Sequence, residues 1–350
     1  MSRSTCLFLA ALLVGPGAAA AQDAELLFLG NSYTAGNDLA AVVESMLDSG
    51  GIATQVERNT PGGYRLPQHL ADVDGANQQV ATWMTPGNTA WDLVVLQDQS
   101  QVPGFFETTP VWVESRDAAV ELHQRVGAVG ARTLLFLTWG RRTGDDSNAQ
   151  LFPDFSTMQD RLTAGYLTFA QAAADASTDA RPVYIAPVGE AFRLVHDDIV
   201  AAGANPTDEA SLFSQLYVGD GSHPSQLGSV LAGFVFVASL TGSLDGVPEP
   251  FGLDASQVAS LRDAAQRAVL DDTSGRFRFP YADGALGDDD DAADDDDAAD
   301  DDDAADDDDA ADDDDSATGC SMTGAPYGAS LLLLLPALVR RRRSSAPSSR

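Results

Sequence analysis

The sequence has no lysine, and among its 350 residues it has only two cysteines and four histidines. Cys6 lies in an apolar run near the N-terminus that is typical of a secretory signal peptide, and removal of that peptide would leave Cys320 as the last cysteine. One cysteine can form no internal disulfide, so the folded region must be stabilised by its hydrophobic core. The histidines are scattered and no cysteine pair occurs, which argues against a zinc site. We therefore expect no metal and no other cofactor.

Clustered cations are also missing from the central part of the chain. The formal net charge is −33, and the arginines of the central region are scattered. Binding to nucleic acid phosphates requires clustered basic side chains. The sequence therefore predicts that nucleic acid is not a partner.

The two ends of the chain differ in composition from the centre. Residues 1–21 combine Arg3, the apolar run 6–14 and small residues before Gln22, which predicts a signal peptide and export. Residues 286–319 consist mainly of repeats of four aspartates and two alanines, which predict a solvated, extended linker. The repeat lacks the glycine and the glutamate that an EF-hand calcium loop needs, so a spacer is the favoured interpretation.

The segment after the linker, residues 320–350, contains Cys320, a short apolar stretch and four consecutive arginines. This order resembles the C-terminal sorting signals of the MYXO-CTERM type. The resemblance implies processing near the cysteine by cell-envelope sorting machinery, with display at the cell surface or outer membrane. The apolar stretch is shorter than the ~20 residues of a spanning helix and is interrupted by Pro336. A weak stop-transfer helix is the alternative, and in both cases we expect the folded region outside the cytoplasm.

The central region, residues 22–285, alternates short apolar runs with longer amphipathic stretches. This alternation predicts one α/β domain, a flavodoxin-like three-layer α/β/α sandwich around a five-stranded parallel sheet. We expect strands over 26–29, 54–58, 93–96, 133–138 and 183–186. Helices are expected over 39–48, 67–84, 111–129, 155–176, 190–202, 225–240 and 255–270.

A serine follows directly on the first expected strand. The apolar run 26–29 breaks at Gly30-Asn31-Ser32, which suits a tight turn out of the carboxyl end of a buried strand. Ligand sites of open α/β sheets lie at this edge. Ser32 is thus a candidate nucleophile, and the alternative is that Asn31 or Ser32 only caps the next helix.

A nucleophilic serine needs a base, and His223 is the best candidate among the four histidines. His69, His123 and His196 fall within expected amphipathic helices, where packing or surface roles are more common. His223 lies in a turn-rich segment before a helix, three residues after Asp220. Such a loop can place a carboxylate beside an imidazole, so that the carboxylate orients the ring and stabilises its charged form.

These blocks together resemble the SGNH (GDSL-type) hydrolases across most of the central region. Gly30-Asn31-Ser32 is similar to the family's nucleophile block, with Asn31 in place of the usual aspartate, and the Asp220 to His223 segment is similar to the last block. The resemblance implies an oxyanion glycine after the second strand, where Gly62 and Gly63 both stand. It also implies an α/β hydrolase of esters without a cofactor.

The third block departs from the family pattern. The resemblance implies an asparagine after the third strand, whereas the chain has Gln97-Asp98-Gln99-Ser100 there. Alignment of the strand ends puts Gln99 at the asparagine position, with Gln97 as the second choice. A glutamine amide can donate a hydrogen bond as asparagine does, but from one methylene further out. Both glutamines could equally serve only as hydrogen-bonding partners within their loop.

Other side chains at the same sheet edge could contact a substrate. Trp139 and Tyr64 could stack on a sugar or an acyl group, although packing is the more common role of an aromatic residue at a strand end. Arg141 and Arg142 could bind an acidic group, although solvated charge is the more common explanation.

Two functions remain open at this stage. The first is an exported, surface-displayed serine esterase that acts on a small ester or an acylated glycan through Ser32, His223 and Asp220. The second is a non-catalytic module of the same fold that binds a glycan or a protein partner. The altered third block favours the second function, and the retention of all three polar residues favours the first.

Overall fold

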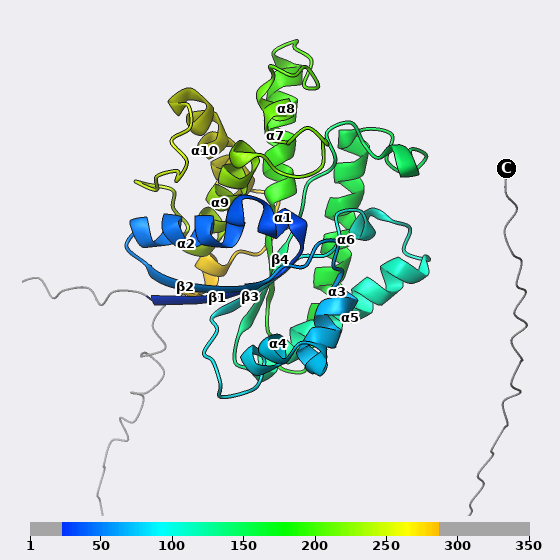
Figure 1. Ribbon diagram of the computed structural model, residues 1–350, viewed down its shortest axis with the longest axis vertical. Helices are drawn as coiled ribbons and strands as arrows, with labels where there is room; N and C mark the ends of the chain where they lie inside the picture. Colours follow the sequence, from blue (N-terminus) through cyan, green and yellow to red (C-terminus); the bar gives the residue numbers. More distant parts are fainter. Residues whose placement is uncertain (1–22, 287–350) are drawn as a thin grey trace, which may run out of the picture. The chain divides into compact units, whose positions relative to one another are not determined.

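The computed structural model describes residues 23–286, which form a five-stranded, all-parallel sheet flanked by helices (Figure 1). The strand order is β2-β1-β3-β4-β5, which is the flavodoxin-like order. The strands are β1 (Asp23–Leu29), β2 (Ala53–Asn59), β3 (Leu93–Leu96), β4 (Arg132–Phe136) and β5 (Val183–Ala186). The expected signal peptide, acidic linker and C-terminal segment lie outside the described residues.

Helices cover both faces of the sheet. On one face α2, α7, α9 and α10 pack against one another, and α3 to α6 lie on the other face (Figure 1). The helices are α1 (Ser32–Ala35), α2 (Leu39–Ser49), α3 (Leu66–Ala71), α4 (Gln78–Trp83), α5 (Pro110–Ala128), α6 (Phe155–Ala176), α7 (Val188–Ala201), α8 (Leu212–Gln215), α9 (Gln226–Thr241) and α10 (Ala255–Val269).

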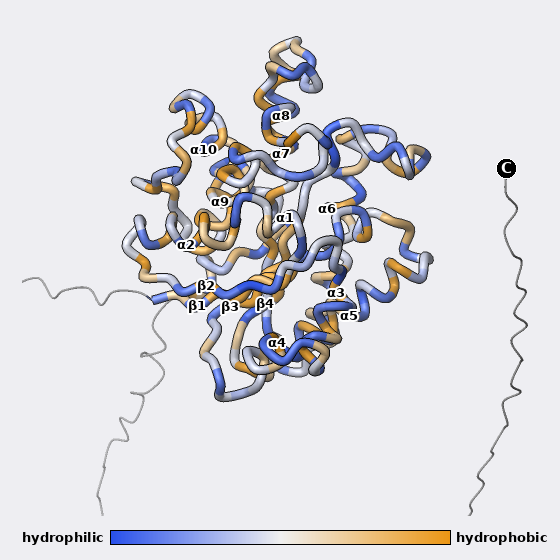
Figure 2. Tube along the Cα trace, viewed as in Figure 1, coloured by the Kyte–Doolittle hydropathy of each residue, from blue (hydrophilic) through white to orange (hydrophobic). Residues whose placement is uncertain are grey.

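The core lies between the sheet and these helices. The central strands β3 and β4 are almost entirely buried, whereas the edge strand β2 is mostly exposed and hydrophilic in Figure 2. Helix α9 is buried from Leu227 to Leu240 because α2, α7 and α10 surround it. A helix that is apolar on all sides is stable only in such a position.

The chain reverses its direction across the sheet between β1 and β3. From β1 the chain passes to β2 on one side and then crosses over to β3 on the other. The carboxyl ends of β1 and β3 are therefore the topological switch point, where open α/β sheets bind their ligands. Gly30-Asn31-Ser32 and Gln97 to Ser100 both emerge there.

The five expected strands and the fold class are confirmed, with small differences at the strand ends. One expected helix is wrong in detail, because the helix predicted over 67–84 is two helices, α3 and α4, joined by a turn over Asp72–Ala76. Gly75 has φ 113° in this turn, a backbone conformation that ends an α-helix, and Asn77 then caps α4. The short helix α1 was not predicted as a helix.

Candidate functional site

The turn after β1 is held by hydrogen bonds from three directions. The Gly30 N–H donates to the Asn59 carbonyl at 3.0 Å, and the Asn31 N–H donates to Oε1 of Gln97 at 2.9 Å. The Gly30 carbonyl accepts a hydrogen bond from His69 Nε2 at 2.9 Å. A Cβ at position 30 would lie 2.4 Å from Oγ1 of Thr34, so only glycine fits there. The backbone that precedes Ser32 is thus rigidly placed.

Asn31, and not Ser32, caps helix α1. The Asn31 side chain accepts a hydrogen bond from the Tyr33 N–H at 3.1 Å, which is the usual N-cap contact. Its amide also donates to the Tyr64 carbonyl at 2.9 Å. Because Asn31 supplies the cap, the hydroxyl of Ser32 is free to point toward another group.

That group is the imidazole of His223. Oγ of Ser32 lies 2.9 Å from Nε2 of His223, and Nδ1 of His223 lies 2.6 Å from Oδ2 of Asp220. The first contact joins residues that are 191 positions apart in the sequence, and the second joins residues that are three positions apart. With the carboxylate on Nδ1, the neutral ring carries its proton there and leaves Nε2 as an acceptor for the serine proton.

Asp220 also organises the loop that carries the histidine. Its Oδ1 accepts the backbone N–H groups of Ser222 at 2.8 Å and His223 at 2.9 Å. Burial pushes the pKa of Asp220 upward, but the hydrogen bonds from the His223 ring and from these two N–H groups outweigh it and lower the pKa below its usual value. Asp220 is therefore ionised at neutral pH.

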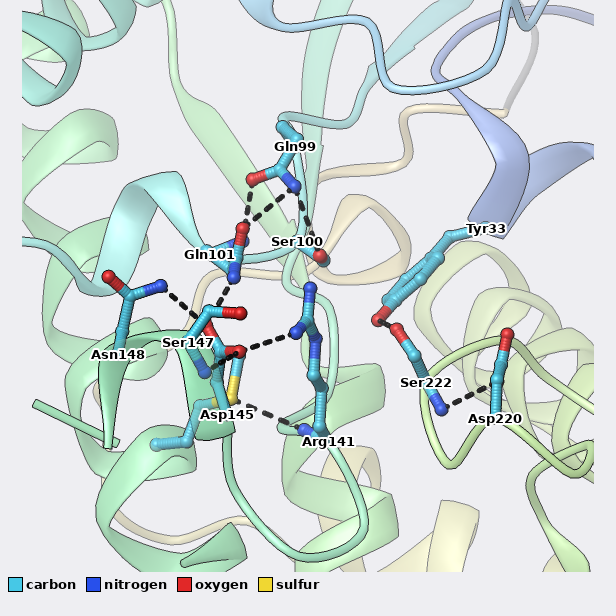
Figure 3. A network of polar contacts seen from close by, with 11 residues as sticks. Tyr33, Gln99, Ser100, Gln101, Arg141, Asp145, Ser147, Asn148, Asp220 and Ser222 are labelled. Carbon is cyan, nitrogen blue, oxygen red and sulfur yellow. Dashed lines mark hydrogen bonds and ion pairs between the residues drawn. The ribbon is translucent and has the colours of Figure 1, made fainter. Parts of the chain in front are cut away.

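Three stacked aromatic rings pack beside the segments that carry Ser32 and His223. Trp139 stacks on Tyr33 at a centroid distance of 4.7 Å and on Phe192 at 4.5 Å, and its Nε1 donates to the Ser222 carbonyl at 3.0 Å. The Tyr33 hydroxyl and Ser222 Oγ are 2.7 Å apart (Figure 3). The segments on which Ser32 and His223 stand are thus joined through their neighbours in the sequence.

These contacts correct the prediction that Trp139 contacts substrate. Trp139 is 0% exposed, and other aromatic rings cover both of its faces. Its ring is therefore not available to stack on a sugar or an acyl group. The sequence indicated its place at the sheet edge, and packing was already the more common role expected there.

The two glutamines of the third block differ in their surroundings. Gln97 is 0% exposed, and its Oε1 accepts from both the Asn31 N–H and the Thr34 hydroxyl. Its Nε2 donates to the Asp98 carbonyl, and because the side chain is fully buried, Gln97 braces the turn and does not face a substrate. Gln99 is half-buried, and its amide donates to Oε1 of Gln101 at 3.1 Å and to Oγ of Ser100 at 3.4 Å (Figure 3). The prediction of Gln97 as an oxyanion donor is replaced by this bracing role.

Gly62 and Gly63 lie in the exposed turn after β2. Gly63 has φ 72°, and an added Cβ at either glycine would meet no other atom within 4 Å. Among residues 23–286, the N–H groups of Gly62, Gly63 and Ser32 donate to no protein acceptor. These three donors are thus available to a ligand.

Asp98 is buried next to the candidate site. Its Oδ1 accepts the N–H groups of Leu66 at 3.0 Å and Gln99 at 2.8 Å, which ties the start of α3 to the loop after β3. Burial raises the pKa of Asp98 to about 6, although these two backbone hydrogen bonds oppose the shift. A nearby buried histidine, His69, has its pKa lowered to about 4, again mainly by burial.

Substitution of Asp98 by asparagine should stabilise the protein in a pH-dependent way. The folded state keeps the Asp98 proton up to about pH 6, whereas an unfolded aspartate releases it near pH 3.9. Between these values the unfolded state binds fewer protons, so wild-type stability falls as the pH rises. Asparagine keeps the acceptor oxygen without a titration. We expect the difference in unfolding free energy between Asp98→Asn and the wild type to shift by about 3 kcal/mol in favour of the variant from about pH 4 to about pH 7, as measured by urea titrations. A difference in unfolding free energy that does not change with pH would contradict this.

A second polar network lies near Tyr33 and Ser222, the sequence neighbours of Ser32 and His223 (Figure 3). Asp145 is 2% exposed, and its carboxylate accepts hydrogen bonds from Nη1 of Arg141 at 2.7 Å and from the Asn148 amide at 2.6 Å. The Gln101 amide donates to the same carboxylate, which connects the loop after β3 to the loop after β4. Arg141 is therefore paired, and not simply solvated as expected. The sequence contained no signal for this network, because its members are joined only by packing of the two loops.

Two kinds of site are absent from the part of the chain that the structure describes. No group of three histidine, cysteine, aspartate or glutamate side chains could hold a metal ion within residues 23–286. None of the helices described there is long and apolar enough to cross a membrane.

Comparison with known proteins finds similar solved structures. A proposed SGNH hydrolase from Slackia heliotrinireducens is 28% identical, with 61% of this chain and 96% of that chain covered and a TM-score of 0.45. A DUF4886 family protein from Bacteroides uniformis is 17% identical, with 70% of this chain and 94% of that chain covered and a TM-score of 0.49. A mutant of an acetyl-xylooligosaccharide esterase from Geobacillus is 14% identical, with 65% of this chain and 97% of that chain covered and a TM-score of 0.42. No family model and no curated protein matches the chain.

Proposed function

We propose that this protein is a serine hydrolase of the SGNH type that cleaves carboxylic esters. The observation that carries the proposal is the chain of contacts from Ser32 Oγ through both nitrogens of His223 to Asp220, at 2.9 Å and 2.6 Å. Both distances are within hydrogen-bond range, which the nucleophile needs to pass its proton to the base and the carboxylate needs to orient the base. The same chain order of serine, aspartate and histidine is expected from the family resemblance.

The proposed reaction has two halves. In the first, His223 takes the proton of Ser32 as Oγ attacks the ester carbonyl, and the protonated ring then gives this proton to the departing alcohol. In the second, His223 takes a proton from water, the hydroxide attacks the acyl-serine, and the proton returns to Ser32 as the acid leaves. Asp220 stays ionised and stabilises the charged ring in both halves.

The oxyanion is proposed to bind the unengaged N–H groups of Ser32 and of Gly62 or Gly63. Gln99 could contribute a further donor only after its amide leaves Gln101. Loss of one oxyanion donor typically costs about 3–4 kcal/mol of transition-state stabilisation. We therefore expect ester hydrolysis at a rate that depends on how the loop that carries Gln99 rearranges when substrate binds.

The substrate is proposed to be a small ester or an acylated glycan outside the cytoplasm. Export and surface display follow from the composition of the two ends of the chain, and not from the folded region. Under this proposal the acidic repeat separates the enzyme from the cell surface, and the sorting machinery is a partner of the C-terminal segment.

Covalent labelling tests the proposed nucleophile. A fluorophosphonate probe should label the purified protein at one site, which peptide mass spectrometry should assign to Ser32. Ser32→Ala should lose the label, whereas Ser222→Ala, which changes another serine beside His223, should keep it. Absence of labelling in the wild type, together with absence of Ser32-dependent turnover of aryl esters, would instead favour a non-catalytic binding module.

A further inference from the structure

A groove of about 630 Å³ lies between two segments that leave the same edge of the sheet. One wall is formed by residues 105–111, between β3 and α5, and the other by residues 146–151, between β4 and α6. We call this feature the Phe106 groove. Phe106 lines it and is 59% exposed, the highest exposure of any large hydrophobic side chain among the described residues.

The two walls differ in chemistry. The first wall presents the rings of Phe105 and Phe106 together with Thr109 and Val111. The second wall combines the polar residues Asp146, Ser147, Asn148 and Gln150 with the apolar residues Ala149 and Leu151. An exposed aromatic ring opposite carboxylate, hydroxyl and amide groups suits a ligand that is itself two-sided. A pyranose sugar has such a shape, with an apolar face and a rim of hydroxyl groups.

The base of the groove is preformed. The Phe105 ring stacks on Phe152, with 5.8 Å between centroids, and Phe152 belongs to a small core with Met158 and Leu162 that is separate from the main core. A Cβ on Gly104 would lie 2.9 Å from the Phe152 ring, so the backbone approaches that ring closely. Such a satellite core fixes both loops without help from a ligand.

The orientation of the exposed ring is also constrained. The Arg161 guanidinium lies 4.7 Å from the centroid of the Phe106 ring and lines a neighbouring pocket instead of this groove. A cation over an aromatic face is stabilising, so Arg161 restricts the ring while the groove side stays open. The groove therefore offers a preoriented aromatic surface.

In the view of Figure 3, the polar network lies between a residue of the Phe106 groove, Asn148, and the sequence neighbours of the proposed nucleophile and base. Asp145 precedes the second wall and holds Asn148, which lines the groove, on one side and Arg141 on the other. In Figure 3, Asn148 and Ser147 lie on one side of Arg141, and Tyr33 and Ser222, the neighbours of the proposed nucleophile and base, lie on the other. A substrate that reaches from Ser32 to the groove would have to extend past this network.

We propose that the Phe106 groove binds the carbohydrate part of an O-acylated oligosaccharide, with a sugar ring stacked on Phe106 and its hydroxyls facing the 146–150 wall. The proposal rests on the esterase function proposed above, because it places the ester of the same molecule at Ser32. An acyl chain would match the apolar part of the lining, but it would cover the polar side chains of the 146–150 wall without supplying hydrogen bonds. A sugar satisfies both walls.

Paired substrates test the proposal. The acetyl esters 4-nitrophenyl acetate and chemically O-acetylated cellotetraose and mannotetraose share one acyl group and differ in the alcohol. Phe106→Ala should lower kcat/KM about tenfold for at least one tetrasaccharide, mainly through KM, and change it less than about twofold for the aryl ester. Phe106→Tyr should restore the tetrasaccharide rate. Val200→Ala, which shortens another exposed hydrophobic side chain on α7, should change neither.

Each other result has a defined meaning. Equal losses on the aryl ester and the tetrasaccharides, or no loss on either tetrasaccharide, would overturn the glycan groove while leaving the esterase intact. A loss confined to 4-nitrophenyl decanoate would also overturn it and assign the groove to an acyl chain. If the wild type hydrolyses none of these esters, the proposed function fails first. In that case calorimetry of Ser32→Ala with the tetrasaccharides still tests binding, and weaker binding after the added Phe106→Ala change would support the groove alone.

Discussion

Substitution of His223 by alanine is expected to lower kcat/KM for a short-chain aryl ester by about 10⁴-fold, with little change in thermal stability. The serine hydroxyl then has no base, because His223 Nε2 is the group within hydrogen-bond distance of Oγ among the described residues. The ring is 43% exposed, so its removal leaves no large cavity. Initial rates with a 4-nitrophenyl ester and a thermal melt measure the two quantities.

The double variant Ser32→Ala/His223→Ala sharpens this prediction. Residues that act as one unit are not additive, so the double variant should be no slower than the slower single variant. The chain also offers a matched control in His196, whose Nδ1 lies 2.7 Å from an Asp197 oxygen but which has no serine partner. His196→Gln should change the rate less than about threefold. A similar loss in both histidine variants would indicate a general structural effect and contradict the proposed base.

The fold was predictable from the sequence because the buried strands are short and strongly apolar. The runs at 93–96 and 183–186 match β3 and β5 at both ends, since each is bounded by polar or turn residues. The break between α3 and α4 was not predictable with the same ease. Glycine is tolerated inside many helices, so the presence of Gly75 does not by itself predict the positive φ that ends the helix.

The candidate site was predictable only where a short motif carried it. Asp220 and His223 are three residues apart in a turn, so their contact follows from local geometry. The buried state of Trp139 and the orientation of Gln97 depend on side chains far away in the sequence, and no local pattern encodes them. Of the two glutamines expected at the asparagine position, the second choice, Gln97, braces the turn instead, and the role of the first choice, Gln99, stays a prediction.

Gln97 provides the second large predicted effect. Substitution by leucine should lower the free energy of unfolding by about 3–5 kcal/mol, because it leaves the Asn31 N–H and the Thr34 hydroxyl without partners and removes one of the two hydrogen bonds to the Asp98 carbonyl. Each unsatisfied buried group costs about 1–3 kcal/mol. Because the same bonds hold the backbone that precedes Ser32, kcat should fall as well, by about tenfold or more.

Joint measurement of stability and rate separates this bracing role from an oxyanion role. An oxyanion donor acts only on the transition state, so its loss lowers kcat and leaves urea unfolding unchanged. Loss of a bracing residue lowers both kcat and the free energy of unfolding. Gln97→Glu retains the two acceptor contacts and loses the donor, and because it buries a carboxyl group it should be less impaired in acid than at neutral pH. Gln99→Leu is the matched control, since this half-buried glutamine contacts only its own loop and its loss should leave unfolding within about 1 kcal/mol of the wild type. A Gln97→Leu variant with wild-type stability and a large loss of kcat would return Gln97 to the oxyanion hole.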